Sequence, residues 1–277
     1  NFRFIAKIDE VVMAFIHLDV FKGIIYLEPG KNYEIVLPKK VQKLPEDELN
    51  PFFEESEFYI RILNGNGQDL NHLIGSFSEH YQKYLEKYFD QFKGQLNKTV
   101  TDSIIHALEK SFSGTTNLFF DNFRHFSYHS LRLLAYDRNK EKFIETVFYN
   151  HPVLVQNPAY MELFNQVFAN YLSAFSKTEY GKEIPYFLIR EKSYSKIKLA
   201  LEQAPFFKDK RLTDLIIVKS LFDNFYREDF PQESIVFIID SIRISSGSNI
   251  NRMIAGNVLE KITNLLLNYP APEFDLP

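Results

Sequence analysis

The chain has 277 residues, of which 45% are hydrophobic and 25% charged, a balance typical of a globular protein with one large or two modest domains. It has no cysteine, which excludes disulfide bonds, thiolate nucleophiles and cysteine-ligated zinc within this sequence. The net charge is −4 and both signs are dispersed, so we expect no nucleic-acid partner. No apolar run approaches the ~20 residues of a transmembrane segment.

Residues 1–50 are expected to form a small antiparallel β segment, a hairpin or part of a β-sandwich. In NFRFIAKI (1–8) every second residue is apolar, which is the periodicity of a strand, and the apolar run VVMAFIHL (11–18) follows. Four short strands make a weak free-standing sheet. We therefore expect further strands to precede this segment.

A hairpin is predicted over GIIYLEPGKNYEIVLP (23–38). Its turn is placed at residues 28–32, because Pro29 presets φ and Gly30 tolerates the positive φ of a type II turn. The acidic segment PEDELNP (45–51) is bounded by prolines and is interpreted as a linker.

Residues 51–267 are expected to form an α-helical domain. From about Gly67 the apolar residues recur with the 3.6-residue period of an amphipathic helix. We expect about nine or ten helices in an irregular bundle, so the fold class is mainly α, and no fixed repeat is evident. The stripes comprise Leu70, Leu73, Ile74, Phe77, Tyr81, Leu85, Tyr88 and Phe92, then Val100, Ile104, Ile105, Leu108 and Phe112, and then Met161, Phe164, Val167, Phe168, Tyr171, Leu172 and Phe175.

Local signals mark where several of these helices begin. Asn157 before Pro158 supplies an N-cap and a proline in the first turn. Further helices are expected over 209–227 and after Pro231. In the turn SSGS (245–248), Ser248 is expected to cap the last helix.

The sharpest polar cluster is DNFRHFSYH (121–129). Asp121, His125 and His129 are four residues apart, so on a helix they share one face and are a candidate metal site. No HExxH glutamate accompanies them. The neighbouring phenylalanines favour the alternative that this is an aromatic core helix whose polar side faces water.

Two other patterns allow a structural or a functional interpretation. NGNG (64–67) precedes a helix, but it is neither a dinucleotide-binding nor a Walker motif, so a flexible joint between the β and α parts is favoured. Aromatic residues could line a partner groove, although core positions are the commoner use of such side chains. The rings considered are Phe52, Phe53, Tyr81, Tyr84, Tyr88, Phe206 and Phe207.

The chain ends on NYPAPEFDLP (268–277), in which alternate prolines suit an edge strand. APEFDLP resembles the segment that leads into the first strand of the redox domain in TlpA/ResA-like thioredoxin-fold envelope proteins. IIYLEPGKNYEIVLPKK (24–40) looks like the closing hairpin of the β-sandwich that opens many such lipoproteins. LNHLIGSFSEHYQKYLEKYF (70–89) resembles the start of their helical segment.

This resemblance implies that residues 268–277 lead into a thioredoxin-like domain that the chain does not contain. It also implies a periplasmic or cell-envelope location, for which a lipid anchor is one expected means of attachment. We expect the chain to be a non-catalytic scaffold and docking region with no cofactor, tethered to that domain and available to a protein partner. The alternative is a helical envelope protein that binds a glycan or peptide in an aromatic groove. The sequence predicts no particular oligomeric state.

Overall fold

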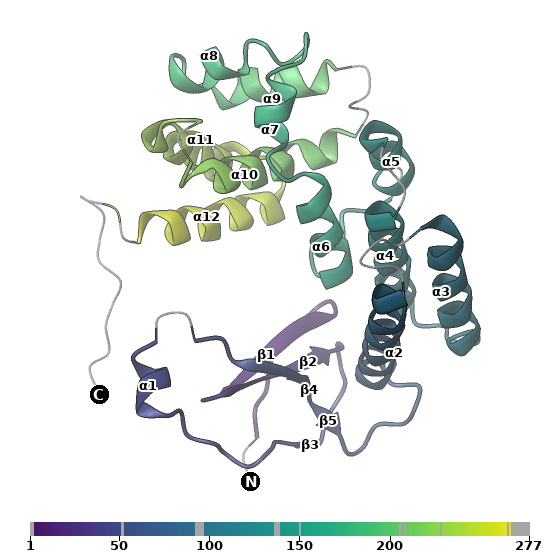
Figure 1. The fold of residues 1–277 in the computed structure, drawn as a ribbon. Coiled ribbons are helices and arrows are strands. Elements are labelled where there is room, and N and C mark those ends of the chain that lie inside the picture. Colours follow the sequence, from purple (N-terminus) through teal and green to yellow (C-terminus); the bar gives the residue numbers. More distant parts are fainter. Residues whose placement is uncertain are drawn as a thin grey trace. The chain divides into compact units, whose positions relative to one another are not determined.

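The computed structural model describes residues 3–50, 53–91, 97–135, 139–149, 151–204, 207, 209–227, 229–264 and 266. The chain divides into two compact units (Figure 1). Unit 1 contains residues 1–138 and 154–163, and unit 2 contains residues 139–153 and 164–277. The mainly α fold with a small N-terminal β part is confirmed. No helix in the described part of the chain has the length and apolarity needed to cross a bilayer.

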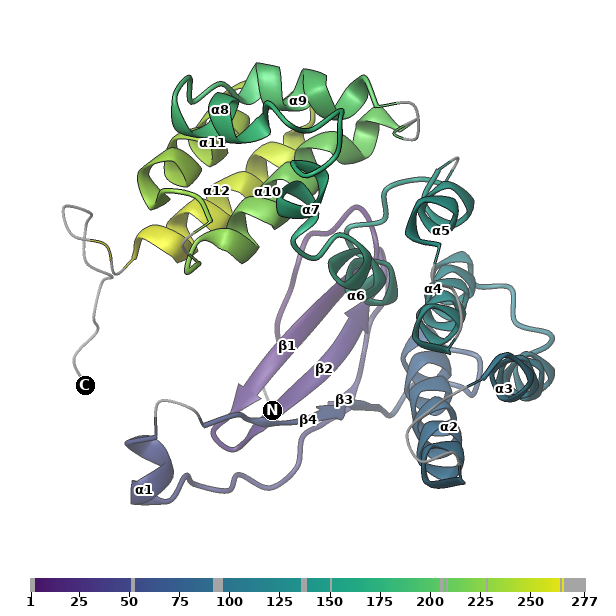
Figure 2. The same cartoon turned by 45° about the horizontal axis from the view of Figure 1, so that its top comes forward.

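The main sheet of unit 1 is built on a hairpin of β1 (Val12–Leu18) and β2 (Phe21–Leu27), which pair antiparallel as seen in Figure 2. Asp19 in the tight turn between them has a φ of 57°. On its other side β2 pairs with β4 (Ser56–Tyr59), and this pairing is parallel. The β segment is therefore mixed, whereas the sequence analysis expected only antiparallel pairing.

The hairpin predicted over 23–38 is wrong, although its turn is right. Gly30 has a φ of 73°, and the Lys31 N–H donates to the Glu28 carbonyl over 3.2 Å, as a type II turn requires. However, β3 (Ile35–Val36) pairs with β5 (Arg61–Ile62) in a second, two-stranded sheet.

Three other expectations for the N-terminal part differ from the structure. Residues 3–8 form no strand, and the predicted linker contains the single-turn helix α1 (Pro45–Glu48). The strands also continue to Ile62, past the predicted boundary at residue 50, because β4 and β5 complete the two sheets.

A buried amide joins the sheet to helix α2 (Leu70–Gln91). The Tyr26 N–H donates to Asn71 Oδ1 over 2.6 Å, and Asn71 Nδ2 donates to the Tyr26 carbonyl over 2.9 Å. Both residues are buried. The side chain of Asn71 thus pairs with the β2 backbone as a neighbouring strand would.

We expect Asn71→Leu to destabilise the protein by about 2–4 kcal/mol, because it leaves a buried backbone N–H and C=O without partners. Urea denaturation followed by circular dichroism measures the loss. The control is His72→Ala, which changes an exposed side chain at the next position of the same helix. If both substitutions lowered the free energy of unfolding equally, the Asn71 amide would not have the structural role described.

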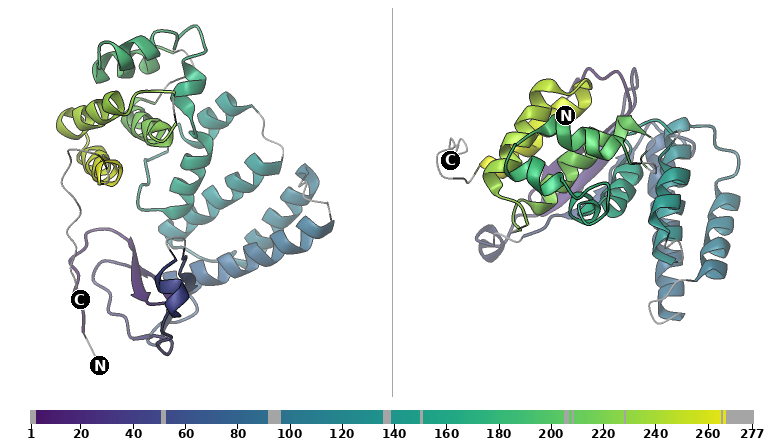
Figure 3. Two further views of the ribbon diagram at one scale, coloured as in Figure 1. Left: turned by 60° about the vertical axis from the view of Figure 1, so that its left-hand side comes forward. Right: turned by 90° about the horizontal axis from the view of Figure 1, so that it is seen from above.

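The helices of unit 1 pack against one another through an aromatic core. Helix α2, α3 (Lys98–Ser111) and α4 (Leu118–Ala135) lie side by side (Figures 1 and 3). Phe77 on α2 is 1% exposed and lies at the centre of this core. Its ring centroid is 5.6–5.9 Å from those of Tyr81, Phe112, Phe120, Phe123 and Tyr128.

Asn157 caps helix α6 (Pro158–Val167) as predicted, since its side chain accepts from the Tyr160 N–H over 3.3 Å. The amide also donates to the Phe119 carbonyl over 3.2 Å. The apolar stripe over 161–175 does not form one helix, because Asn170 has a left-handed φ of 51° and ends the run.

Unit 2 is built around α10 (Thr213–Asn224), which is buried on most of its circumference. Helices α7, α9, α11 and α12 contact it. Ser248 caps α12 as predicted, accepting from the Asn251 N–H over 3.3 Å. The helices named so far are α7 (Tyr171–Phe175), α9 (Tyr194–Glu202), α11 (Gln232–Ser245) and α12 (Asn249–Thr263). The unit also contains α5 (Lys140–Val147), α8 (Ile184–Ile189) and the 3₁₀ helix η1 (Lys210–Leu212).

The C-terminal segment 268–277, on which the thioredoxin-like resemblance depends most, lies outside the described residues. Its predicted role as the lead-in to a further domain stays a prediction.

Candidate functional site

The candidate metal residues do not form a metal site. All three lie on α4, and helical spacing brings the rings of His125 and His129 to 4.6 Å between centroids. The Asp121 carboxylate is instead paired with Arg124, one turn further along the helix. Among the described residues, no group of three histidine, aspartate or glutamate side chains could hold a metal ion. Asp121, His125 and His129 therefore do not converge as the motif suggested.

A polar cluster in unit 2 surrounds Asp214 on α10. Its Oδ1 accepts from the Tyr194 hydroxyl over 2.6 Å and from Lys198 Nζ over 2.8 Å. Its Oδ2 accepts from the Ser246 hydroxyl over 2.5 Å. These contacts connect α10 to α9 and to the end of α11, so the cluster has a structural use.

Burial by itself would raise the pKa of Asp214, whose side chain is only 5% exposed. The hydrogen bonds that the carboxylate accepts, together with the Lys198 charge, outweigh burial and hold the pKa below its ordinary value. Asp214 is therefore ionised at neutral pH and is not poised to exchange a proton there.

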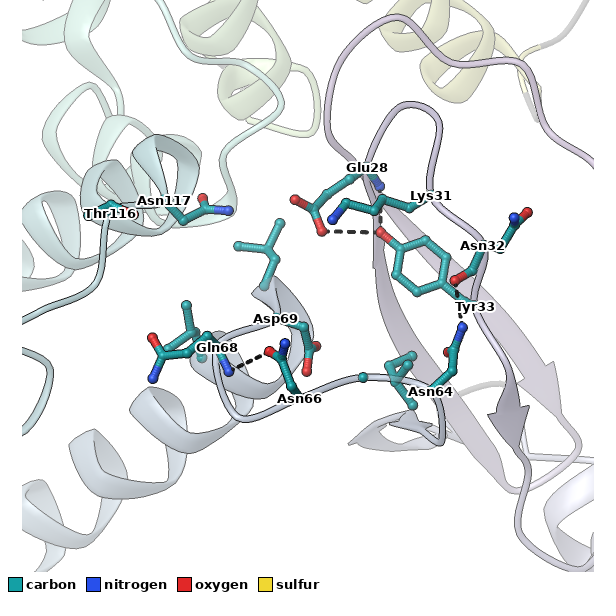
Figure 4. Close-up of a pocket in the computed structure, with 14 residues that line it drawn as sticks. Glu28, Lys31, Asn32, Tyr33, Asn64, Asn66, Gln68, Asp69, Thr116 and Asn117 are labelled. Atoms are coloured by element: carbon teal, nitrogen blue, oxygen red, sulfur yellow. Dashed lines mark hydrogen bonds between the residues drawn. The ribbon is translucent and has the colours of Figure 1, made fainter.

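A polar cleft of about 420 Å³ opens on unit 1, and we call it the amide cleft (Figure 4). Three segments line it: the turn at 28–33, the loop and first turn of α2 at 62–73, and residues 116–117 before α4. Five of its side chains are amides, namely Asn32, Asn64, Asn66, Gln68 and Asn117. This concentration of amides distinguishes it from the aromatic core beneath.

One wall of the amide cleft is held by Tyr33 and Glu28. The Tyr33 hydroxyl accepts from the Glu28 backbone N–H over 2.9 Å and donates to the Glu28 carboxylate over 3.3 Å. Burial raises the pKa of Tyr33 to about 12, with the negative charge of Glu28 acting in the same direction. The phenol is thus neutral at physiological pH and can donate.

The second wall is the loop that the sequence analysis interpreted as a flexible joint, and the structure fixes it closely. Asn64 accepts from the Glu34 N–H over 2.9 Å and donates to the Asn32 carbonyl over 3.0 Å. A Cβ at Gly65 would lie 2.7 Å from Asp69 Oδ2, so a larger residue there would require the Asp69 side chain to shift.

The floor of the cleft includes the capped N-termini of two helices. Asn66 Oδ1 accepts from the Gln68 N–H over 2.9 Å, and Asp69 accepts from the His72 N–H over 3.0 Å at the start of α2. Asn117 Oδ1 accepts from the Phe120 N–H over 3.0 Å at the start of α4. Asn66, in the turn before α2, and Asn117, the cap of α4, both accept through the amide oxygen, so their Nδ2 groups remain to donate to a ligand.

The cleft can bind a polar molecule, and its lining is made mostly of polar side chains. Its charged side chains are Glu28, Lys31 and Asp69. From the sequence, only Asn64–Gly67 of this site stood out as a functional candidate; the turn at 28–32 was assigned a structural role, and Tyr33 and Asn117 were not singled out. The Asn before an apolar stripe at 117 is an N-cap signal, and it could have indicated the second helix start.

The aromatic residues considered for a groove are partly or fully covered wherever the structure describes them. Phe207 is buried, and Phe53, Tyr81, Tyr84 and Tyr88 are half-buried. Phe52 and Phe206 lie outside the described residues. Comparison with known proteins adds no further assignment: no family model matches the chain, and no curated protein or solved structure is significantly similar to it, so the resemblance to the TlpA/ResA-like family stays a prediction.

Proposed function

We propose that this chain is the non-catalytic scaffold and docking region of a thioredoxin-like envelope protein, with the redox domain following Pro277. The observation that carries the proposal is that polar and aromatic side chains join the elements of the fold and fill its core. The Asp214 cluster joins helices, Asn71 joins a helix to the sheet, and the rings around Phe77 fill a core. These side chains hold the fold together, which supports a scaffold role.

A docking region also needs an exposed surface for the domain it positions. Helix α11 offers Phe237, which is 52% exposed, and Ile244, which is 65% exposed, two turns apart on one face. Tethering raises the effective concentration of a linked domain, so even a weak contact here would orient it.

The coding sequence after Pro277 tests the proposal. We expect a thioredoxin-like domain with a Cys-x-x-Cys motif to begin there and to be complete within about 150 residues, the usual size of a domain. A stop codon at that point, or a following domain of another fold, would contradict the proposal.

A second candidate is the envelope binding protein with no redox role. The aromatic groove predicted for it is not favoured, because the nominated rings that the structure describes are half-buried or, for Phe207, buried. The amide cleft favours this candidate in a different form, with a polar binding surface on unit 1.

A further inference from the structure

We infer that the amide cleft binds a neutral, polyhydroxylated ligand of the carbohydrate class. This goes beyond the scaffold function and does not depend on it, because the site lies wholly within unit 1. The volume of about 420 Å³ lies within the range of small-molecule sites, about 300–1,000 Å³.

The hydrogen-bonding groups of the cleft match hydroxyl groups, each of which both donates and accepts. The amides of Asn66 and Asn117 supply donors, and Lys31 supplies a third. The carboxylates of Glu28 and Asp69 supply acceptors. Figure 4 shows Lys31 beside Glu28 on one side of the space, Asn66 beside Asp69 on another, and Asn117 on a third.

Two of the donors are fixed before any ligand arrives. The oxygens of Asn66 and Asn117 are held by the backbone N–H groups of Gln68 and Phe120, which sets the direction of each Nδ2 group. Binding then costs less side-chain entropy than it would with mobile amides.

The charges and the lining argue against other ligand classes. The lining carries two carboxylates and one lysine, so its net negative charge disfavours an anion such as phosphate. Only Ile62, Leu70 and Leu73 provide apolar side chains, which is too little for a lipid. The residues that the structure describes contain no group suited to a metal ion.

The test is an NMR titration of the isotopically labelled chain with a panel of neutral trisaccharides, namely maltotriose, cellotriose, chitotriose and mannotriose, at millimolar concentrations. We expect at least one sugar to shift the backbone signals of Asn32, Gln68 and Asn117. The double variant Asn66→Asp, Asn117→Asp keeps both accepting oxygens and removes both Nδ2 donors. It should weaken binding at least tenfold, about 1.4 kcal/mol.

The matched control is Asn97→Asp, which makes the same change at the cap of α3, where Asn97 accepts from the Val100 N–H over 3.1 Å outside the cleft. It should leave the affinity unchanged. The inference is overturned if no sugar of the panel binds, if the shifts lie outside the cleft, or if the double variant binds as tightly as the control. Cleft-specific shifts with inorganic phosphate or with an acidic or basic peptide, and none with the sugars, would also overturn it.

Discussion

Phe77→Ala is expected to destabilise unit 1 by about 3–5 kcal/mol, because it removes a fully buried ring and leaves a cavity among five other rings. The edge-to-face arrangement with Phe120 and Phe123 is lost as well. Urea denaturation followed by circular dichroism measures the change, and the midpoint should fall while the denaturant slope stays constant.

The control for this variant is Phe237→Ala, which truncates a phenylalanine that is 52% exposed. We expect it to cost less than about 1 kcal/mol. If Phe77→Ala were no more damaging than Phe237→Ala, the aromatic core of unit 1 would not be what holds α2, α3 and α4 together. Phe77→Leu, which fills part of the cavity, should recover part of the loss.

Asp214→Ala is expected to destabilise unit 2 by about 3–5 kcal/mol, because it leaves the partners of a buried carboxylate uncompensated. Ser246 is 1% exposed and would lose the oxygen to which it donates. The control is Asp240→Ala on α11, whose carboxylate pairs with Arg243 at the surface over 2.7 Å. An exposed pair of this kind contributes at most about 1 kcal/mol.

The stabilisation by Asp214 also depends on pH. Its folded-state pKa lies below the ordinary value, so the contribution is complete above about pH 5 and is lost as the pH falls below about 4. The difference in unfolding free energy between the wild-type chain and Asp214→Asn should therefore be constant near neutral pH and shrink in acid. A difference that grows in acid would show that the carboxylate is destabilised by burial.

The helices were predictable because their signals are local. The stripe from Leu70 to Phe77 follows from the helical period, and Asn157 and Ser248 cap helices through bonds to residues three positions away. The strand pairing was not predictable in this way. The turn at Gly30 is correct in detail, yet β2 pairs with β1 and with β4, which lies about thirty residues further on. Pairing of that kind is decided by burial of the sheet, not by the turn.

The site was less predictable than the fold. The pair of histidines on α4 follows from helical spacing alone, but Arg124 takes the carboxylate that would have completed a metal site. The amide cleft brings together three segments that are distant in sequence. Each of them carries only turn or capping signals, and their convergence depends on how the sheets pack against α2.

The central claim is that this chain positions a redox domain that it does not itself contain. The most direct test is to express the chain together with the sequence that follows Pro277 and to measure reduction of a disulfide-bonded model substrate. We predict that the extended protein reduces the substrate and that a Cys→Ser change in its Cys-x-x-Cys motif abolishes this activity. An extended protein with no such motif, or with no effect on the substrate, would contradict the account.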